Sequence, residues 1–207
     1  YSSTPENNTI VMEVKKQFRD GIVIPREQIE EYIKEDDCVL IGPGMVRDNE
    51  TETITNTLFT KYPNKQWVID AGSLQMMDRT KIPKHAILTP HHREFAHAFG
   101  SEEVARVGKK YQCIVLLKGE KDIACDEQGN CRVIEGGNPG MTKGGTGDVL
   151  AGLVAALACR NDPFLAACAG SYINKKAGDA LYVRVGPYFN ATDLAGQIPQ
   201  TMSRLLL

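Results

Sequence analysis

The sequence has no long apolar run and almost no surplus of charge. No stretch approaches the roughly 20 residues that a helix needs to cross a bilayer, and we expect no secretory signal at its start. The 207 residues carry 24 Lys and Arg against 26 Asp and Glu, a formal net charge of −2. This balance lacks the excess of positive charge that is typical of proteins that bind nucleic acid or membrane surfaces in general. We therefore expect a cytoplasmic protein with no nucleic-acid and no membrane partner.

The sequence also lacks a C-x-x-C pair, and with it the usual signature of a zinc or dithiol site. Cys38 and Cys113 stand beside apolar residues, and Cys159 and Cys168 lie in alanine-rich helical segments, where a reduced cysteine acts as a small apolar residue. Cys125 and Cys131 flank a predicted hairpin turn over 126–130 and could approach each other. We expect reduced cysteines, with that pair as the exception, and no metal-binding residues.

Short apolar runs alternate with helical stretches, a pattern typical of an α/β protein with a largely parallel sheet. The patterns predict strands over 38–41, 66–69, 86–88 and 113–117, a hairpin over 122–135, and helices over 48–61, 92–99, 102–110, 148–158, 164–180 and from Thr192. No repeat, charge block or low-complexity linker divides the chain. We therefore expect one domain over 1–207.

Polar or glycine-rich residues follow four of the predicted strands directly. These segments are Gly42-Pro43-Gly44, Asp70-Ala71-Gly72, Thr89-Pro90-His91-His92 and Lys118-Gly119. In an open parallel sheet, ligands bind at the carboxyl ends of the strands. Each segment alone could be no more than a turn, but four together predict a ligand crevice.

Several of the 19 glycines gather between Gly136 and Gly152, where Gly144-Gly145-Thr146-Gly147-Asp148 leads into an apolar helix. The N-terminus of a buried helix offers free N–H groups and a positive dipole end, and glycines let phosphate oxygens approach the backbone. Two other phosphate motifs are absent. Lys143 precedes the glycines, unlike the lysine of a P-loop, and Gly42-Pro43-Gly44 lacks the third glycine of a dinucleotide fingerprint.

Asp148 has two interpretations. A carboxylate in the first turn of a helix can simply stabilise the helix dipole, a contribution of about 0.3–1 kcal/mol. Beside a phosphate-binding loop it can instead accept a proton from a hydroxyl that attacks a terminal phosphoryl group, while the N–H groups stabilise the developing charge. The density of glycine before it favours the second interpretation.

These segments resemble a known family. Gly144-Gly145-Thr146-Gly147-Asp148 is similar to the anion hole and catalytic Asp of ribokinase-like small-molecule kinases. The string from Asn138 to Gly152, with Gly42-Pro43-Gly44, Leu88-Thr89-Pro90-His91, Lys118-Gly119 and Ala191-Thr192-Asp193-Leu194, resembles the nucleotide-dependent NAD(P)H-hydrate dehydratases, a metabolite-repair family. The resemblance covers the chain from about residue 37 to residue 199.

The resemblance implies a ribokinase-like three-layer α/β/α fold with a mainly parallel central sheet. It implies that ADP or ATP, with Mg²⁺, drives dehydration of the S-form of hydrated NADH or NADPH, by phosphorylation of the hydrate hydroxyl and elimination of phosphate. Gly44, His91 and Asp148 would contact the hydrate, and Asp148 would act as the catalytic base. The nucleotide would contact Lys118, Gly119, Glu120, Lys121, Asp122, Gly144, Gly145, Thr146 and Gly147.

The chain departs from the family pattern in three places. The family begins with a strand, a glycine-rich segment and a helix to which nothing at Tyr1 corresponds, so we expect an N-terminally incomplete domain. Val46 stands where the family usually has glycine. Asp70-Ala71-Gly72 replaces the more usual Asp-Ala-Asp, which argues against Asp70 as a site residue.

Two other functions fit the same residues. A kinase of a small alcohol or vitamin precursor would share the anion hole and Asp148 but release a phosphorylated product. An inactive module would bind nucleotide without turnover. For the dehydratase, the family further suggests a homotetramer and a fused or separate NAD(P)H-hydrate epimerase, with the choice between ADP and ATP and between the two hydrates left open.

Overall fold

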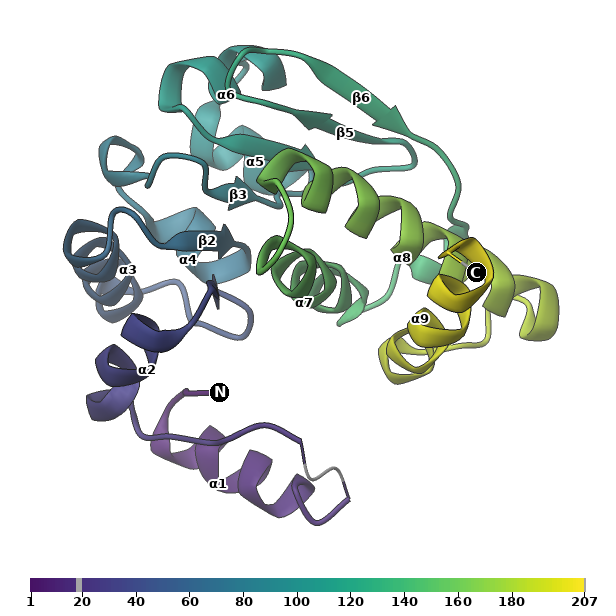
Figure 1. Cartoon of the computed structure of the whole chain (residues 1–207), viewed down its shortest axis with the longest axis horizontal. Coiled ribbons are helices and arrows are strands. Elements are labelled where there is room, and N and C mark those ends of the chain that lie inside the picture. The colour runs from purple at the N-terminus through teal and green to yellow at the C-terminus, as the bar shows by residue number, and fades with distance from the viewer. Residues whose placement is uncertain (18–19, 207) are drawn as a thin grey trace. The chain divides into compact units, whose positions relative to one another are not determined.

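The computed structural model describes residues 1–17 and 20–206, and the chain forms two compact units, Tyr1–Asp37 and Cys38–Leu207 (Figure 1). The first unit contains helices α1 (Pro5–Val14) and α2 (Ile29–Glu35), neither of which the sequence patterns predicted. Thr4 starts α1, because its side chain accepts a hydrogen bond from the Asn7 N–H and proline follows it. The single domain over 1–207 stays a prediction.

The second unit is built on a six-stranded sheet in the order β1-β2-β3-β4-β5-β6. Its strands are β1 (Cys38–Ile41), β2 (Gln66–Ile69), β3 (Ile87–Leu88), β4 (Ile114–Leu117), β5 (Asp122–Cys125) and β6 (Cys131–Ile134). The first four strands are parallel, and β5 and β6 form an antiparallel hairpin at one side. The predicted mainly parallel sheet is confirmed.

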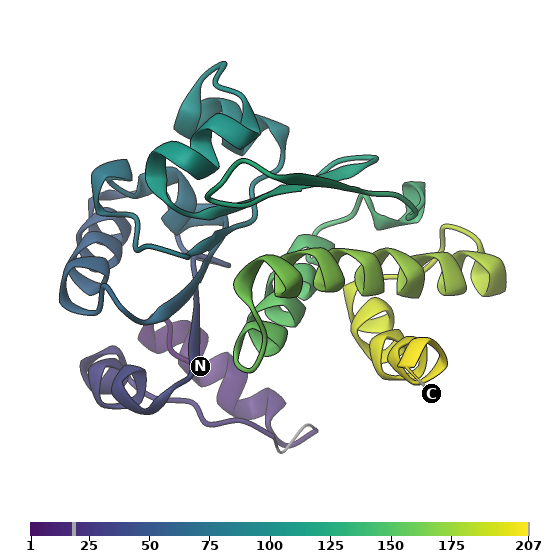
Figure 2. The same cartoon turned by 45° about the horizontal axis from the view of Figure 1, so that its top comes forward.

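Helices cover both faces of this sheet, with α7 and α8 on one side and α5 and α6 on the other (Figures 1 and 2). The helices of this unit are α3 (Asn49–Lys61), α4 (Ala71–Met76), α5 (His92–Phe99), α6 (Val104–Tyr111), α7 (Thr146–Ala158), α8 (Pro163–Val185) and α9 (Ala191–Leu206). The short helix α4 was not predicted, and α8 runs five residues beyond the predicted end at 180. Across the described residues, no helix combines the length and the apolar character needed to span a membrane.

Alternation along the strands divides the core between the two faces. Val68 and Ile114 pack toward Val154 of α7 and the alanines of α8, whereas Trp67 stacks edge-on against Phe59 of α3, with ring centroids 5.2 Å apart. Successive strand side chains point to opposite faces, so each strand contributes to both layers. This packing holds α7 against the sheet, with its first turn near the carboxyl ends of the strands.

The prediction of reduced cysteines, with Cys125 and Cys131 as the exception, is confirmed. Cys125 and Cys131, directly paired across β5 and β6, form a disulfide, while Cys38, Cys113, Cys159 and Cys168 are free. The bond ties the predicted hairpin together next to its turn.

Cys113 should resist alkylation in the native protein. Burial raises the pKa of its thiol to about 12, and only the thiolate is an effective nucleophile. After treatment with iodoacetamide at pH 8, mass spectrometry should find Cys113 unmodified, and modified only when urea is added. Cys159, which is half-buried, serves as the comparison; equal labelling of both in the native protein would contradict the burial of Cys113.

Candidate functional site

The four segments that follow parallel strands lie next to one another at the carboxyl edge of the sheet. The Asp70 N–H donates to the Ile41 carbonyl over 3.1 Å, and the Lys118 N–H donates to the Pro90 carbonyl over 2.8 Å. A bridge pairs His91 with Lys118 beyond the ends of β3 and β4. The predicted meeting of these segments is therefore confirmed.

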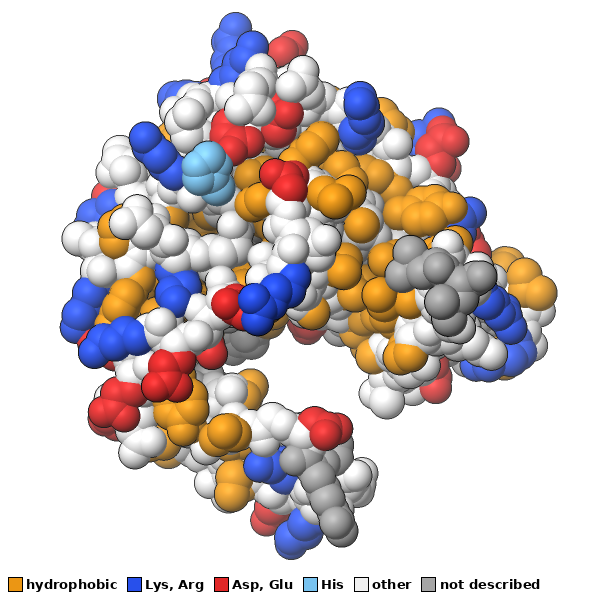
Figure 3. Space-filling model, in the orientation of Figure 1, with side chains coloured by type: hydrophobic (Ala, Val, Ile, Leu, Met, Phe, Trp, Pro, Cys, Tyr) orange, Lys and Arg blue, Asp and Glu red, His pale blue; other side chains and the backbone are white. Residues whose placement is uncertain are grey.

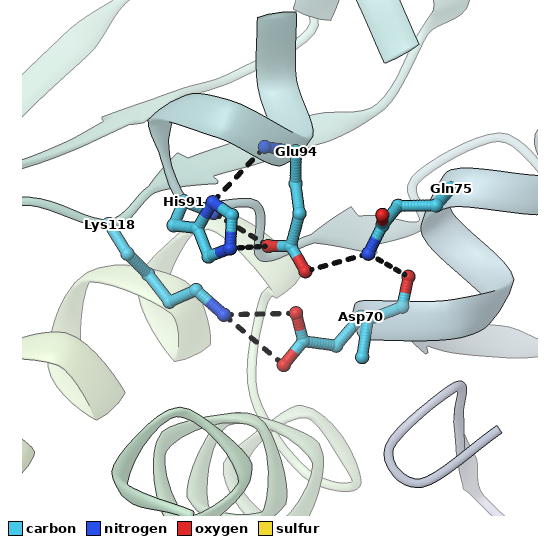
Figure 4. A network of polar contacts seen from close by, with 6 residues as sticks. Asp70, Gln75, His91, Glu94 and Lys118 are labelled. Carbon is cyan, nitrogen blue, oxygen red and sulfur yellow. Dashed lines mark hydrogen bonds and ion pairs between the residues drawn. The ribbon is translucent and has the colours of Figure 1, made fainter. Parts of the chain in front are cut away.

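Asp70 and Lys118 form a buried ion pair at this edge (Figure 4). The Lys118 Nζ lies 2.9 Å and 3.2 Å from the two Asp70 carboxylate oxygens, and Asp70 is 1% exposed. Burial raises the pKa of Asp70; the nearby Lys118 opposes this effect, and the charge of Glu94 adds to it. A raised carboxylate pKa means that ionisation of Asp70 costs folding stability, so the pair adds little net stability to the fold.

Sequence reasoning had set Asp70 aside because the following residues depart from the family pattern. The signal for Asp70 is its position, a carboxylate directly after the apolar, fully buried residues Trp67 to Ile69 at the ligand-binding edge. The backbones of Gly42 and Asp70 are tightly packed at this edge, because a Cβ at Gly42 would lie 1.8 Å from the Asp70 carbonyl oxygen.

His91 and Glu94 cap the start of α5 reciprocally (Figure 4). The His91 Nδ1 accepts from the Glu94 N–H over 3.1 Å, and the Glu94 Oε2 accepts from the His91 N–H over 2.9 Å. Gln75 of α4 donates to the other Glu94 oxygen over 3.1 Å. Since Nδ1 is an acceptor, a neutral His91 ring carries its proton on Nε2, and about half of the side chain is exposed. The cap therefore uses Nδ1, and the Nε2, which lies 3.6 Å from the Glu94 Oε2, is the donor side of the ring.

The glycine-rich loop opens α7 with free donors. Gly145 is the N-cap and has a φ of +88°, and the Thr146 hydroxyl donates to the carbonyls of Met141 and Lys143 over 2.7 Å and 2.8 Å. Within residues 1–17 and 20–206, no carbonyl or side chain accepts the N–H groups of Gly144, Gly145, Gly147 or Asp148. These four donors lie at the positive end of a 13-residue helix, where an anion would be stabilised. The anion hole itself stays a prediction.

The cation beside this anion hole is Lys118, not Lys143. A Cβ at Gly147 would lie 3.4 Å from the Lys118 Nζ, so the ammonium of the Asp70 pair reaches the first turn of α7. The Lys143 ammonium instead donates to the carbonyls of Pro187 and Phe189 and lies over the Phe189 ring. Lys143 therefore anchors the loop to the connection between α8 and α9.

Asp148 is exposed in the first turn of α7. Its carboxylate makes no hydrogen bond or ion pair with any other residue that the structure describes. It therefore does not cap the helix through a side-chain bond, and it is free to meet a ligand. Its role as a base stays a prediction.

The other predicted site residues have different surroundings. Gly44 has a φ of +73° and open space at its Cβ position, and Glu120 is exposed. Lys121 forms an exposed ion pair with Glu135. The Asp122 carboxylate is buried and bound within the protein, where it accepts from the Gly119 N–H over 2.9 Å. Asp122 therefore shapes the 118–122 loop through its side chain.

A cavity of about 790 Å³ lies away from this edge, between β6 and the start of α8. Its lining includes Val133, Phe164, Leu165 and Tyr172, and Figure 3 shows hydrophobic side chains gathered over this part of the molecule. It contains none of the predicted site residues. Among the described residues there is also no cluster of three or more His, Cys, Asp or Glu side chains that could hold a metal ion.

Comparison with known proteins gives a consistent assignment. The family model described as NAD(P)H-hydrate dehydratase matches residues 4–200. A bifunctional NAD(P)H-hydrate repair enzyme of Archaeoglobus fulgidus is 38% identical over 178 residues, covering 86% of this chain and 37% of that protein. An ADP-dependent (S)-NAD(P)H-hydrate dehydratase of Xanthomonas campestris is 32% identical, covering 82% of this chain and 62% of that protein. The chain thus spans between about a third and two thirds of the length of these relatives.

Solved structures show the same fold. An ADP/ATP-dependent NAD(P)H-hydrate dehydratase from Bacillus subtilis, co-crystallised with ATP and Mg²⁺, matches with a TM-score of 0.81. The alignment has 22% identity and covers 95% of this chain and 76% of that one. The predicted ribokinase-like α/β/α fold is confirmed.

Proposed function

This chain belongs to the NAD(P)H-hydrate dehydratase family, and from that premise we propose that it dehydrates the S-form of hydrated NADH or NADPH at the expense of ADP or ATP. The observation that carries the proposal is the first turn of α7. There, four N–H groups and the Asp148 carboxylate, none of them bonded within the described part of the chain, lie beside the Lys118 ammonium. This set provides what phosphoryl transfer to a hydroxyl requires, namely a base, anion donors and a cation.

In the proposed reaction, Asp148 takes the proton of the hydrate hydroxyl while the hydroxyl oxygen attacks the terminal phosphorus of the nucleotide. The new bond joins that oxygen to phosphorus, and the bond from phosphorus to the bridging oxygen of the nucleotide breaks. The N–H groups of Gly145 and Gly147 stabilise the charge on the phosphoryl oxygens. The lone pair of the nicotinamide ring nitrogen then expels phosphate from the neighbouring carbon. Loss of a proton from the ring carbon next to that one restores NADH or NADPH.

The edge residues divide between the two ligands in this proposal. Gly44 and the Nε2 of His91 contact the hydrate, since both are exposed at the ends of β1 and β3. The nucleotide lies along the 118–122 loop and the glycines of residues 144–147. Asp70 fixes the Lys118 ammonium toward Gly147, where it meets the transferred phosphoryl group.

Mg²⁺ fits this site only as an ion held largely by phosphate oxygens and water, because the described residues offer no cluster of ligands for it. When bound, it offsets phosphate charge during transfer. We further propose a cytoplasmic homotetramer that works with an NAD(P)H-hydrate epimerase, fused or separate. The bifunctional repair enzyme of Archaeoglobus fulgidus supports the pairing with a second activity.

The test is recovery of absorbance near 340 nm when the protein meets hydrated NADH, Mg²⁺ and either ADP or ATP. Recovery that depends on nucleotide, with release of inorganic phosphate, is the expected result. If absorbance does not recover and phosphate appears on another small alcohol, the protein is a ribokinase-like kinase. If nucleotide binds with no turnover of any kind, it is an inactive binding module.

A further inference from the structure

Helix α8 carries a buried ammonium that the proposed reaction does not use. Lys175 is 5% exposed, and its Nζ donates to the carbonyls of Gly119 and Glu120 over 3.2 Å and 3.0 Å. The same nitrogen lies 3.2 Å from the Asp122 Oδ1. One side chain thus contacts three residues of the 118–122 loop.

Asp122 completes this connection from the other side. Its Oδ1 accepts from the Gly119 N–H, and its Oδ2 accepts from the Ser171 hydroxyl over 2.7 Å. Ser171 is fully buried one helical turn before Lys175. The loop is therefore fastened to α8 through both its backbone and its carboxylate.

The glycines of the next loop make room for the lysine. A Cβ at Gly137 would lie 3.3 Å from the Lys175 Cγ, and a Cβ at Gly136 would lie 3.6 Å from the Lys175 Cβ. Both glycines have positive φ. A buried ion pair usually contributes little net stability against its desolvation cost, so this arrangement calls for another explanation.

Resting on the function proposed above, we propose that Lys175 is a positioning residue that holds the 118–122 loop in the shape that binds nucleotide. Without its ammonium, the carbonyls of Gly119 and Glu120 lose their donors and the loop gains alternative conformations. Binding must then order the loop, and a site that is not preorganised binds more weakly. Chemistry at Asp148 lies on another helix and is not affected directly.

The experiment compares ADP binding to the wild-type protein and to Lys175→Met by calorimetry, with steady-state kinetics beside it. We expect the Kd for ADP to rise by about tenfold or more, since preorganisation is lost. The KM for hydrated NADH and the kcat at saturating ADP should change by no more than about twofold, because Asp70 holds the Lys118 ammonium independently of Lys175 and bound ADP orders the rest of the loop. A purely structural role would lower the thermal midpoint and leave the Kd of the folded protein unchanged.

Lys176→Met is the matched control. It removes the same charge from the next position of α8, where the ammonium lies over the Tyr172 ring instead of the loop. Its Kd for ADP should equal that of the wild type. Equal Kd values for Lys175→Met and the wild type would overturn the inference, whether or not the protein dehydrates the hydrate. A wild-type protein that binds ADP without turnover would refute only the proposed function.

Loss of Lys175 alone leaves the Asp122 carboxylate buried without its partner, which can prevent folding. In that case the double variant Lys175→Met with Asp122→Asn is measured, because removing both charges of a buried pair together is often neutral for stability. A Kd for ADP that is raised above that of Asp122→Asn alone supports the positioning role, because Asp122 also holds the loop through the Gly119 N–H. A Kd no higher than that of Asp122→Asn contradicts it.

Discussion

Replacing Asp148 with Asn should lower kcat by on the order of 10²-fold or more, because an amide cannot take the proton of the hydrate hydroxyl. ADP should still bind, since the N–H groups of the α7 first turn and the Lys118 ammonium are unchanged. The fold should also persist, because the exposed Asp148 carboxylate makes no bond within the described chain. Calorimetry with ADP and the absorbance assay near 340 nm measure the two effects separately.

Asp162→Asn is the control for this variant. Asp162 also starts a helix, but its carboxylate caps α8 by accepting from the Leu165 N–H over 2.9 Å. The Asp162→Asn variant should have a slightly lower free energy of unfolding and an unchanged kcat. If Asp148→Asn retains turnover as well, Asp148 only stabilises the helix dipole, and another residue must act as the base.

Replacing Gly42 with Ala should lower the free energy of unfolding by about 3 kcal/mol or more, through strain and overlap with the backbone. Gly42 has a φ of +114°, and its Cβ would lie 1.8 Å from the Asp70 carbonyl oxygen. Neither group can move freely, because β1 and β2 are hydrogen-bonded neighbours. Urea denaturation followed by circular dichroism measures the change.

Gly152→Ala makes the same chemical change where the structure has room. Gly152 lies within α7 and has nothing near its Cβ position, so the replacement should be neutral or stabilise the helix by up to about 1 kcal/mol. Comparable losses for both variants would mean that Gly42 and Asp70 do not approach as closely as described.

Much of the second unit could be predicted because each element has a strong local pattern. The apolar run Ile114–Leu117 is buried throughout. The helix from Thr146 is apolar along its length and buries one side of its surface, including Leu150 and Val154. Helices α1 and α4 were not predicted, for two different reasons. The first has no buried residue, so it shows no apolar stripe, and the second is only six residues long.

The site could be predicted where chemistry follows a strand or opens a helix, as for Lys118 and Asp148. Pairings between distant residues could not be predicted, because no local pattern joins Asp70 to Lys118 or Lys175 to Gly119. The glycines illustrate the same limit. Those at 144, 145 and 147 surround the proposed anion hole, whereas Gly137 accommodates Lys175 and Gly140 accommodates the Phe189 ring.

The close packing of α7 against α8 links the two halves of the proposed nucleotide site. A Cβ at Gly170 of α8 would lie 2.6 Å from the Val154 Cγ2 of α7. The α8 backbone at Gly170 therefore packs directly against the Val154 side chain. One helix presents the anion hole and the other fastens the 118–122 loop. A larger residue at Gly170, which is not among the proposed ligand contacts, would therefore move the phosphate donors away from the loop and lower nucleotide affinity indirectly.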